Sequence, residues 1–153
     1  MAPKKSVQLS GIVVAESAIC SIDPEEGLLM YRGYDIADLA EHSSYEEVAY
    51  LLLEGELPSA AQLDAFKEEL ADRELPRAVQ ALVDGNHRDA TPMEMLRTAV
   101  SLLSFSDPDE SSTERAEERR KAIRLIAQLP TIVARHHRLR QGLDPVLPDP
   151  TLS

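Results

Sequence analysis

Histidine residues are scattered along this chain of 153 residues rather than grouped as metal ligands. The four are His42, His87, His136 and His137. None has the spacing of a metal-binding motif. His136 and His137 are adjacent, and on a helix adjacent side chains point about 100° apart, so one helix cannot direct both at the same ion. We therefore expect no metal site, a partly buried His136 and an exposed His137.

Candidate nucleophiles are equally isolated. Ser17 lies between Glu16 and Ala18, without the glycines of a nucleophile elbow. Cys20 is the only cysteine, so an intrachain disulfide is impossible, and its apolar surroundings predict a buried, inert thiol. The six glycines are too far apart to form a phosphate-binding loop. The sequence thus predicts no catalytic, cofactor-binding or metal-binding residue and no cofactor.

The densest polar constellation is the segment from Tyr31 to Asp35, in which Arg32 precedes Gly33. A planar guanidinium suits carboxylates, so Arg32 could act as an anion clamp. The alternative is a corner between a strand and a helix that Asp35 caps, with Arg32 paired to Glu25 or Glu26. We favour the corner.

The charge of the chain excludes a general binder of polyanions. It has 16 Lys and Arg against 27 Asp and Glu, a net charge of −11, and nucleic-acid affinity depends on a basic surface. Residues 113–140 alone carry a local net charge of +5. This stretch could face an acidic partner, a phosphorylated ligand or the acidic remainder of the chain. We favour a solvated helix face with internal ion pairs, because Glu117 precedes Arg120 and Lys121 by three and four residues.

Membrane insertion and export are not expected. The longest apolar run, residues 48–53, has six residues, whereas a membrane-spanning helix needs roughly 20. The apolar stretch after Lys4 and Lys5 is too short for a signal peptide. We expect a cytoplasmic protein with no membrane and no nucleic-acid partner.

Strand signals are confined to the first third of the chain. Apolar segments at 11–15, 18–22 and 28–31 are separated by polar or turn-forming residues. Asp23-Pro24-Glu25-Glu26-Gly27 has the chemistry of a turn, which predicts a hairpin between the second and third segments.

Helix signals fill the remainder. Four capping boxes are expected, at Ser44 to Glu47, Ser59 to Gln62, Thr91 to Glu94 and Ser111 to Glu114. Pro76 starts a shorter helix that the Asp84-Gly85-Asn86 turn ends. Residues 113–141 predict a long helix in which Pro130 forces a kink or a division into two halves.

These elements predict a mainly α protein with a short N-terminal β-ribbon or hairpin followed by about six helices. The expected organisation is an N-terminal tail at 1–10, a ribbon at 11–33, helices at 35–142 and a Pro-rich tail at 143–153.

Two apolar stripes need to be covered. One is Met93, Leu96, Val100 and Leu103; the other is Ile123, Ile126, Ile132, Val133 and Leu139. This chain has few helices with which to bury both, so we expect a homodimer or a complementing subunit to associate through helices 92–104 and 113–141.

Several motifs, in one order, resemble the citrate synthase and 2-methylcitrate synthase family. They are VVAESAICSID at 13–23, EEGLLMYRGYDIADLA at 25–40, SSYEEVAYLLLEGELPS at 43–59, PMEMLRTAVSLL at 92–103, DPD at 107–109 and LPTIVARHHRLRQG at 129–142. The resemblance implies an almost entirely helical, all-α fold with a large and a small domain in a homodimer, and it places this chain in the N-terminal part of the large domain. The family condenses acetyl-CoA with oxaloacetate, using an Asp and two His.

The family's catalytic motifs lie downstream of the segments matched here. Gly85-Asn86-His87-Arg88 is not its Gly-His-Arg motif, because Asn86 intervenes and no Tyr follows. The resemblance therefore implies an N-terminal portion or subunit of a tricarboxylic acid cycle acyltransferase. It would be inactive alone, active only with a complementing catalytic half, and in contact with acetyl-CoA and oxaloacetate only in the assembled enzyme.

Two other functions stay open. One is a non-catalytic paralogue that binds and regulates or stabilises a full-length citrate synthase. The other is a small-molecule binding module that uses the basic helix.

Overall fold

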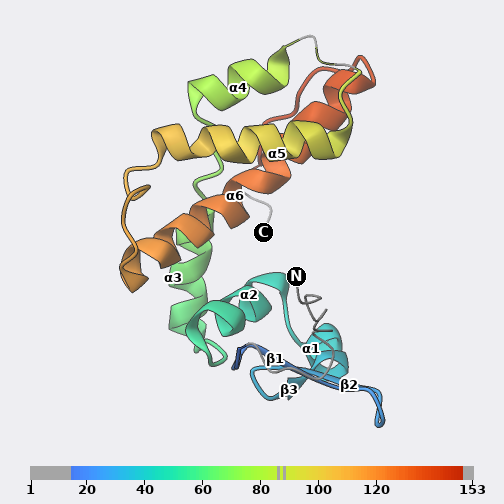
Figure 1. Ribbon diagram of the computed structural model, residues 1–153, viewed down its shortest axis with the longest axis vertical. Helices are drawn as coiled ribbons and strands as arrows, with labels where there is room; N and C mark the ends of the chain where they lie inside the picture. Colours follow the sequence, from blue (N-terminus) through green and yellow to red (C-terminus); the bar gives the residue numbers. More distant parts are fainter. Residues whose placement is uncertain (1–14, 86, 88, 150–153) are drawn as a thin grey trace, which may run out of the picture. The chain divides into compact units, whose positions relative to one another are not determined.

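The computed structural model describes residues 15–85, 87 and 89–149. Backbone contacts divide the chain into two compact units, Met1–Leu57 and Pro58–Ser153. The expected N-terminal tail lies outside the described residues. Of the strand predicted at 11–15, only Ala15 is described, and it belongs to no strand. Figure 1 shows the order of the elements along the chain.

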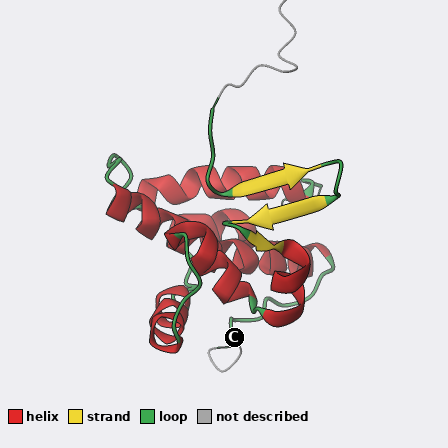
Figure 2. Cartoon of the chain, turned by 90° about the horizontal axis from the view of Figure 1, so that it is seen from below, coloured by secondary structure: helices red, strands yellow, loops and turns green. Residues whose placement is uncertain are grey.

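The first unit contains a three-stranded antiparallel sheet in the order β1-β2-β3. Its strands are β1 (Cys20–Asp23), β2 (Leu28–Tyr31) and β3 (Tyr34–Asp35). Figure 2 colours these strands yellow and the helices red. An all-α description is therefore not fully right, whereas the predicted mainly α fold with an N-terminal ribbon is confirmed.

The predicted hairpin between β1 and β2 is confirmed, with Asp23 opposite Leu28. The Oδ1 atom of Asp23 accepts hydrogen bonds from the backbone N–H groups of Glu25 and Glu26, at 3.0 and 3.1 Å. Gly27 completes the turn with a φ of 69°. An Asp side chain that binds the backbone two and three residues later is what starts this turn.

Two helices follow the sheet, α1 (Ile36–His42) and α2 (Tyr45–Glu54). Asp35 caps α1 by accepting from the N–H of Ala37 at 2.7 Å, as predicted. Ser44 and Glu47 form the predicted capping box at the start of α2. Gly55, with a φ of 100°, ends α2 in the left-handed conformation that glycine adopts without strain.

The described residues of the second unit form helices joined by loops, without a strand. It contains α3 (Ala60–Leu70), α4 (Arg77–Asp84), α5 (Pro92–Leu103), the 3₁₀ turn η1 (Ser104–Ser106) and α6 (Arg115–Arg140). The predicted capping boxes at Ser59 and Thr91 are both present. The fourth prediction is wrong: α6 begins at Arg115 with Glu114 as its N-cap, which makes no side-chain capping bond.

The core of the second unit joins α4, α5 and α6. Its buried residues are Leu75, Val79, Val83, Met95, Ala99, Leu103 and Ile132. On α5 the inward stripe is Met95, Ala99 and Leu103, which follow one another at four-residue intervals on one helix face. Of the predicted α5 stripe, Leu103 is buried and Leu96 packs against the core, but Met93 is 70% exposed.

The predicted long last helix is confirmed, but its division into two halves at Pro130 is wrong. α6 is a single helix of 26 residues with Pro130 inside it. Proline removes one backbone hydrogen bond, but burial of Ile123, Ala127 and Ile132 on both sides of it holds the helix together. Among the described residues, none of the helices is long and apolar enough to cross a membrane.

Candidate functional site

Arg32 lies at a corner between two strands, β2 and β3, rather than at the predicted corner between a strand and a helix, and its partner also differs from the one expected. Arg32 and Gly33 have φ values of 50° and 91°, and two successive positive φ values are typical of a tight hairpin turn. The Nη2 atom of Arg32 donates to the carbonyl oxygen of Leu52 at 2.8 Å, near the end of α2. A cation there interacts favourably with the negative end of the helix dipole, which replaces the predicted pairing with Glu25 or Glu26.

The two candidate nucleophiles, Cys20 and Ser17, are both exposed. Cys20 is exposed, so the predicted burial of its thiol is wrong. All four residues of β1, an edge strand of the sheet, are exposed. The hydroxyl of Ser17, which is also exposed, accepts a hydrogen bond from the N–H of Ile19 at 3.2 Å.

The basic stretch at 113–140 is α6, and most of its cations are paired within the second unit. Arg119 makes two hydrogen bonds to Glu69, at 2.5 and 3.2 Å. Arg135 likewise binds both carboxylate oxygens of Asp84, at 2.5 and 2.7 Å. Lys121 pairs with Glu118 at 2.9 Å. Within α6, the predicted pair of Glu117 with Arg120 forms at 2.9 Å, whereas Lys121 binds Glu118 instead of Glu117. The acidic partners of Arg119 and Arg135 come from other helices of the same unit.

A network of charges fastens the loop after η1 to α6. Asp109 accepts from Arg120 at 2.8 and 3.0 Å and from Arg124 at 2.9 Å. Arg124 also binds Asp107 at 2.5 Å. The hydrogen bonds from Arg120 and then Arg124 hold the pKa of Asp109 well below its usual range. Asp109 therefore stays an anion that is committed to structural bonds.

Among the described residues, no group of three or more His, Cys, Asp or Glu could hold a metal ion. His137 is exposed. His136 is 4% exposed, more deeply buried than expected. Burial, followed by the charge of Arg140, lowers the pKa of His136.

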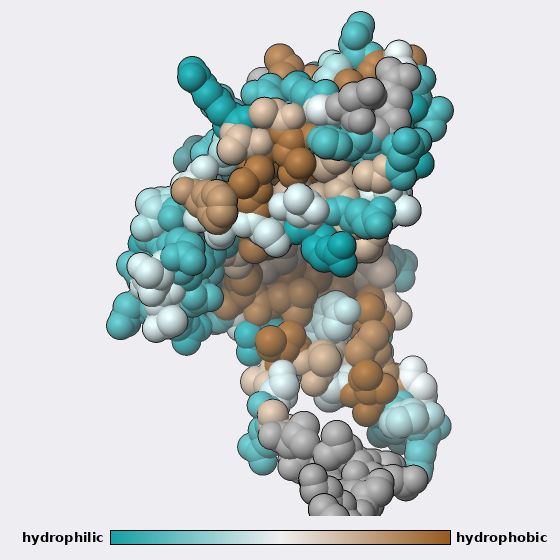
Figure 3. Space-filling view, turned by 45° about the horizontal axis from the view of Figure 1, so that its top comes forward, coloured by the Kyte–Doolittle hydropathy of each residue, from teal (hydrophilic) through white to brown (hydrophobic). Residues whose placement is uncertain are grey.

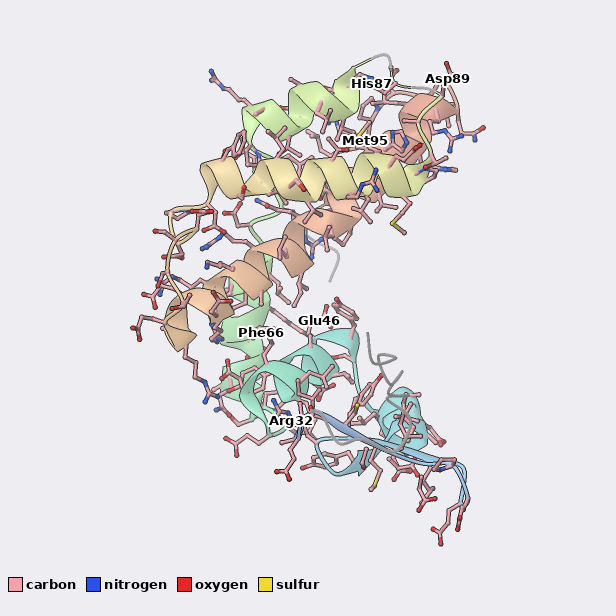
Figure 4. The ribbon with its side chains drawn as sticks, in the orientation of Figure 1. Arg32, Glu46, Phe66, His87, Asp89 and Met95 are labelled. Carbon is pink, nitrogen blue, oxygen red and sulfur yellow. The ribbon has the colours of Figure 1, made fainter. Side chains whose placement is uncertain are left out.

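An apolar hollow opens between α5 and α6. Its volume is about 230 Å³, and its lining is Pro92, Met95, Leu96, Ile132, Val133, His136 and His137. Next to it on these helices, Met93 is 70% exposed and Val133 is 51% exposed. We call Met93, Leu96 and Val133 with this hollow the α5–α6 face. Figure 4 places Met95 toward the N-terminal end of α5, and Figure 3 shows apolar residues gathered in patches among hydrophilic ones.

Sequence reasoning missed two features of this region. It placed Met95 outside the apolar stripe, because a run of apolar residues in α5 allows more than one choice of inward face. It also did not detect the apolar hollow, because a hollow depends on how two helices pack and no residue type or spacing signals that packing.

The comparisons with known proteins, by family model, by sequence and by structure, agree on one family. The model of the family described as "Citrate synthase, C-terminal domain" matches residues 8–153. The chain is 44% identical over 141 residues to 2-methylcitrate synthase of Mycobacterium tuberculosis, covering 92% of this chain and 35% of that protein. It is 43% identical over 148 residues to citrate synthase of Mycolicibacterium smegmatis, covering 96% of this chain and 39% of that protein.

Among solved structures, citrate synthase from Pyrobaculum aerophilum resembles this chain with a TM-score of 0.86 and 36% sequence identity. The likeness covers 94% of this chain and 38% of that one. The chain therefore spans between a third and two fifths of the length of these relatives. Because the family model matches nearly every residue and the fold agrees over the same span, the chain belongs to the citrate synthase family.

Proposed function

We propose that this chain is the N-terminal scaffold portion of a citrate synthase-type acyltransferase, which condenses acetyl-CoA with oxaloacetate to citrate in the tricarboxylic acid cycle. In this proposal the chain supplies helices and an association surface, and another part of the enzyme supplies the catalytic groups. The observation that carries it is the agreement of fold and sequence over 94% of this chain with 38% of a citrate synthase.

Three of the described carboxylates are unsuited to the proton transfer that the condensation requires. The condensation requires a carboxylate that is free to remove a proton from the acyl group. The carboxylates of Glu94, Asp109 and Glu117 all have a lowered pKa, because each accepts hydrogen bonds from a capping residue or an arginine. An anion held in this way is a poor general base.

The α5–α6 face supports an association role. In the second unit it combines an apolar hollow with the exposed side chains of Met93 and Val133. Exposed apolar surface next to a hollow is typical of an interface, because burying it releases water from both partners. We propose that a second copy of the chain, or the complementing catalytic subunit, covers this face.

A release assay for the CoA thiol tests the catalytic part of the proposal. The purified chain is assayed with oxaloacetate and either acetyl-CoA or propionyl-CoA, because a citrate synthase and a 2-methylcitrate synthase are about equally similar to it. It is then assayed as a chimera, in which residues 8–153 replace the matching segment of the Mycolicibacterium smegmatis citrate synthase. We expect no thiol release from the chain alone and release from the chimera, with the preferred thioester identifying the substrate.

Each alternative outcome has a defined meaning. Thiol release by the chain alone would overturn the scaffold assignment. A chimera that is folded by circular dichroism but inactive would show that this segment cannot serve in a synthase. If the chain then bound the intact Mycolicibacterium smegmatis enzyme and changed its rate, the regulatory paralogue would replace our proposal.

A further inference from the structure

A second pocket, separate from the apolar hollow, is also lined by His136. Its volume is about 120 Å³, and it lies where α4 and α6 end, lined by Asp84, Gly85, His87, His136 and Arg140 among others. Figure 4 shows His87 on the segment that follows α4. A Cβ added to Gly85 would come within 2.6 Å of Nε2 of His87, so the imidazole lies directly against the glycine backbone.

His136, which lines both this pocket and the apolar hollow, has an unpaired polar atom. The residue is 4% exposed, and its Nε2 atom has no hydrogen-bond partner among the described residues. Its ring also interacts with the backbone of Ala90. A buried nitrogen without a partner loses its hydrogen bonds to water and gains none in return, which is costly unless something else enters the pocket to bind it.

The charges around His136 favour an anion. The groups whose charge lowers the pKa of His136 are Arg140, His137 and His87, and all of them are cations or become cations on protonation. The carboxylate that lines the pocket, Asp84, gives both of its oxygens to Arg135 at 2.5 and 2.7 Å. A metal cation would add positive charge beside Arg140, whereas an anion would offset the positive charge already present.

The volume of the pocket suits a small ion. Liquid water occupies about 30 Å³ per molecule, so a pocket of about 120 Å³ has room for roughly four water molecules. An anion of that size could accept hydrogen bonds from a guanidinium and from imidazoles at the same time.

We propose that this pocket is a binding site for a small oxyanion, of the phosphate or carboxylate class, held by Arg140, His87 and His136. When the anion binds, His136 takes up a proton from solvent, so that its ring donates from both nitrogens. This site does not depend on the acyltransferase proposal, because it uses no catalytic group and none of the α5–α6 face except the ring of His136.

The test is an NMR titration of the full chain with inorganic phosphate, compared with chloride at the same ionic strength. The signals of His136 are assigned by their loss in His136→Asn. We expect saturable shifts of these signals and a higher pKa for His136 in phosphate than in chloride. A parallel titration with acetate distinguishes a site for phosphate from one for carboxylates.

Two variants locate the site. Arg140→Gln changes an exposed residue, and we expect phosphate binding at least about tenfold weaker, which corresponds to about 1.4 kcal/mol. Arg115→Gln is the matched control, because Arg115 is an exposed arginine at the opposite end of α6, and binding should not change. His87→Gln should weaken binding without affecting the fold, since His87 is exposed.

Three results would overturn the proposal. One is a titration curve of His136 that does not differ between phosphate, acetate and chloride. Another is a phosphate response that Arg140→Gln leaves intact, which would place the ion elsewhere. The third is a response of His87 and His136 to zinc ions with none to either oxyanion, which would make the pocket a cation site.

Discussion

Arg32 illustrates at the residue scale how a role predicted from local sequence can be right while the partner is wrong. A corner forms at Tyr31 to Asp35, and Asp35 caps α1 as predicted, but the corner joins two strands rather than a strand and a helix. Its arginine reaches the carbonyl oxygen of Leu52, 20 residues further along the chain, instead of a nearby carboxylate. Local spacing identifies Glu25 and Glu26 as partners, but the folding of α2 against the corner brings a carbonyl oxygen within reach.

His136 should make the stability of the chain depend on pH. Its pKa is lowered below 6.5 in the folded state, first by burial and then by Arg140, so the unfolded state binds the proton more readily. The stability from a neutral His136 is therefore complete above about pH 6.5 and is lost as the pH falls toward the lower, folded pKa. Urea unfolding from pH 7.5 to 5.5 should show a falling midpoint.

A matched pair of variants isolates this effect. His136→Gln should flatten the pH dependence over this range, whereas His137→Gln, at the exposed neighbouring position, should retain it. Equal slopes for the two variants would show that another group is responsible for the pH dependence.

At the element scale, the capping boxes decide where helices start. Three of the four predicted boxes form, and each places its N3 side chain on the backbone N–H of the N-cap residue. The fourth does not form, because Asp109 and its arginines hold the loop before α6 in another conformation. In that loop the hydroxyl of Ser112 accepts from the N–H of Glu114.

This contrast gives a prediction for two serines. Ser59→Ala removes the acceptor for the N–H of Gln62 at the start of α3 and should lower the free energy of unfolding by about 1 kcal/mol. Ser111→Ala removes a hydroxyl that caps no helix and should change it by less than about 0.5 kcal/mol. Urea unfolding measures both, and a cost for Ser111→Ala as large as that for Ser59→Ala would contradict the assigned start of α6.

At the scale of the whole molecule, the α5–α6 face should control association. Leu96 packs against the core, so replacing it would disturb the fold as well as the surface. Met93 and Val133, at 70% and 51% exposure, can be changed with little effect on the core. They are therefore the better residues with which to test the face.

We expect Met93→Glu with Val133→Glu to weaken association by at least roughly thirtyfold, because truncating or charging a central interface residue costs about 2 kcal/mol or more. Sedimentation measures the mass, and circular dichroism confirms that the helices persist. Ile22→Glu is the control, since Ile22 has the same 70% exposure but lies on β1. An unchanged mass for the double variant would remove the α5–α6 face from the interface.

The sequence by itself determined the elements and the family. Three signals depend only on residues close together in the sequence, so the sequence alone predicts the elements they mark. They are the turn residues at 23–27, the capping serines and threonine, and the apolar periodicity of the helices. Several motifs in one order likewise identified the citrate synthase family.

The tertiary structure alone decided which surfaces and pockets those elements form. Four features depend on residues far apart in sequence. They are the exposure of Cys20, the partner of Arg32, the continuity of α6 through Pro130 and the two pockets beside His136. Burial and pocket shape follow from how helices and strands pack together, and the free energy of that packing is shared among many residues rather than set by any local pattern.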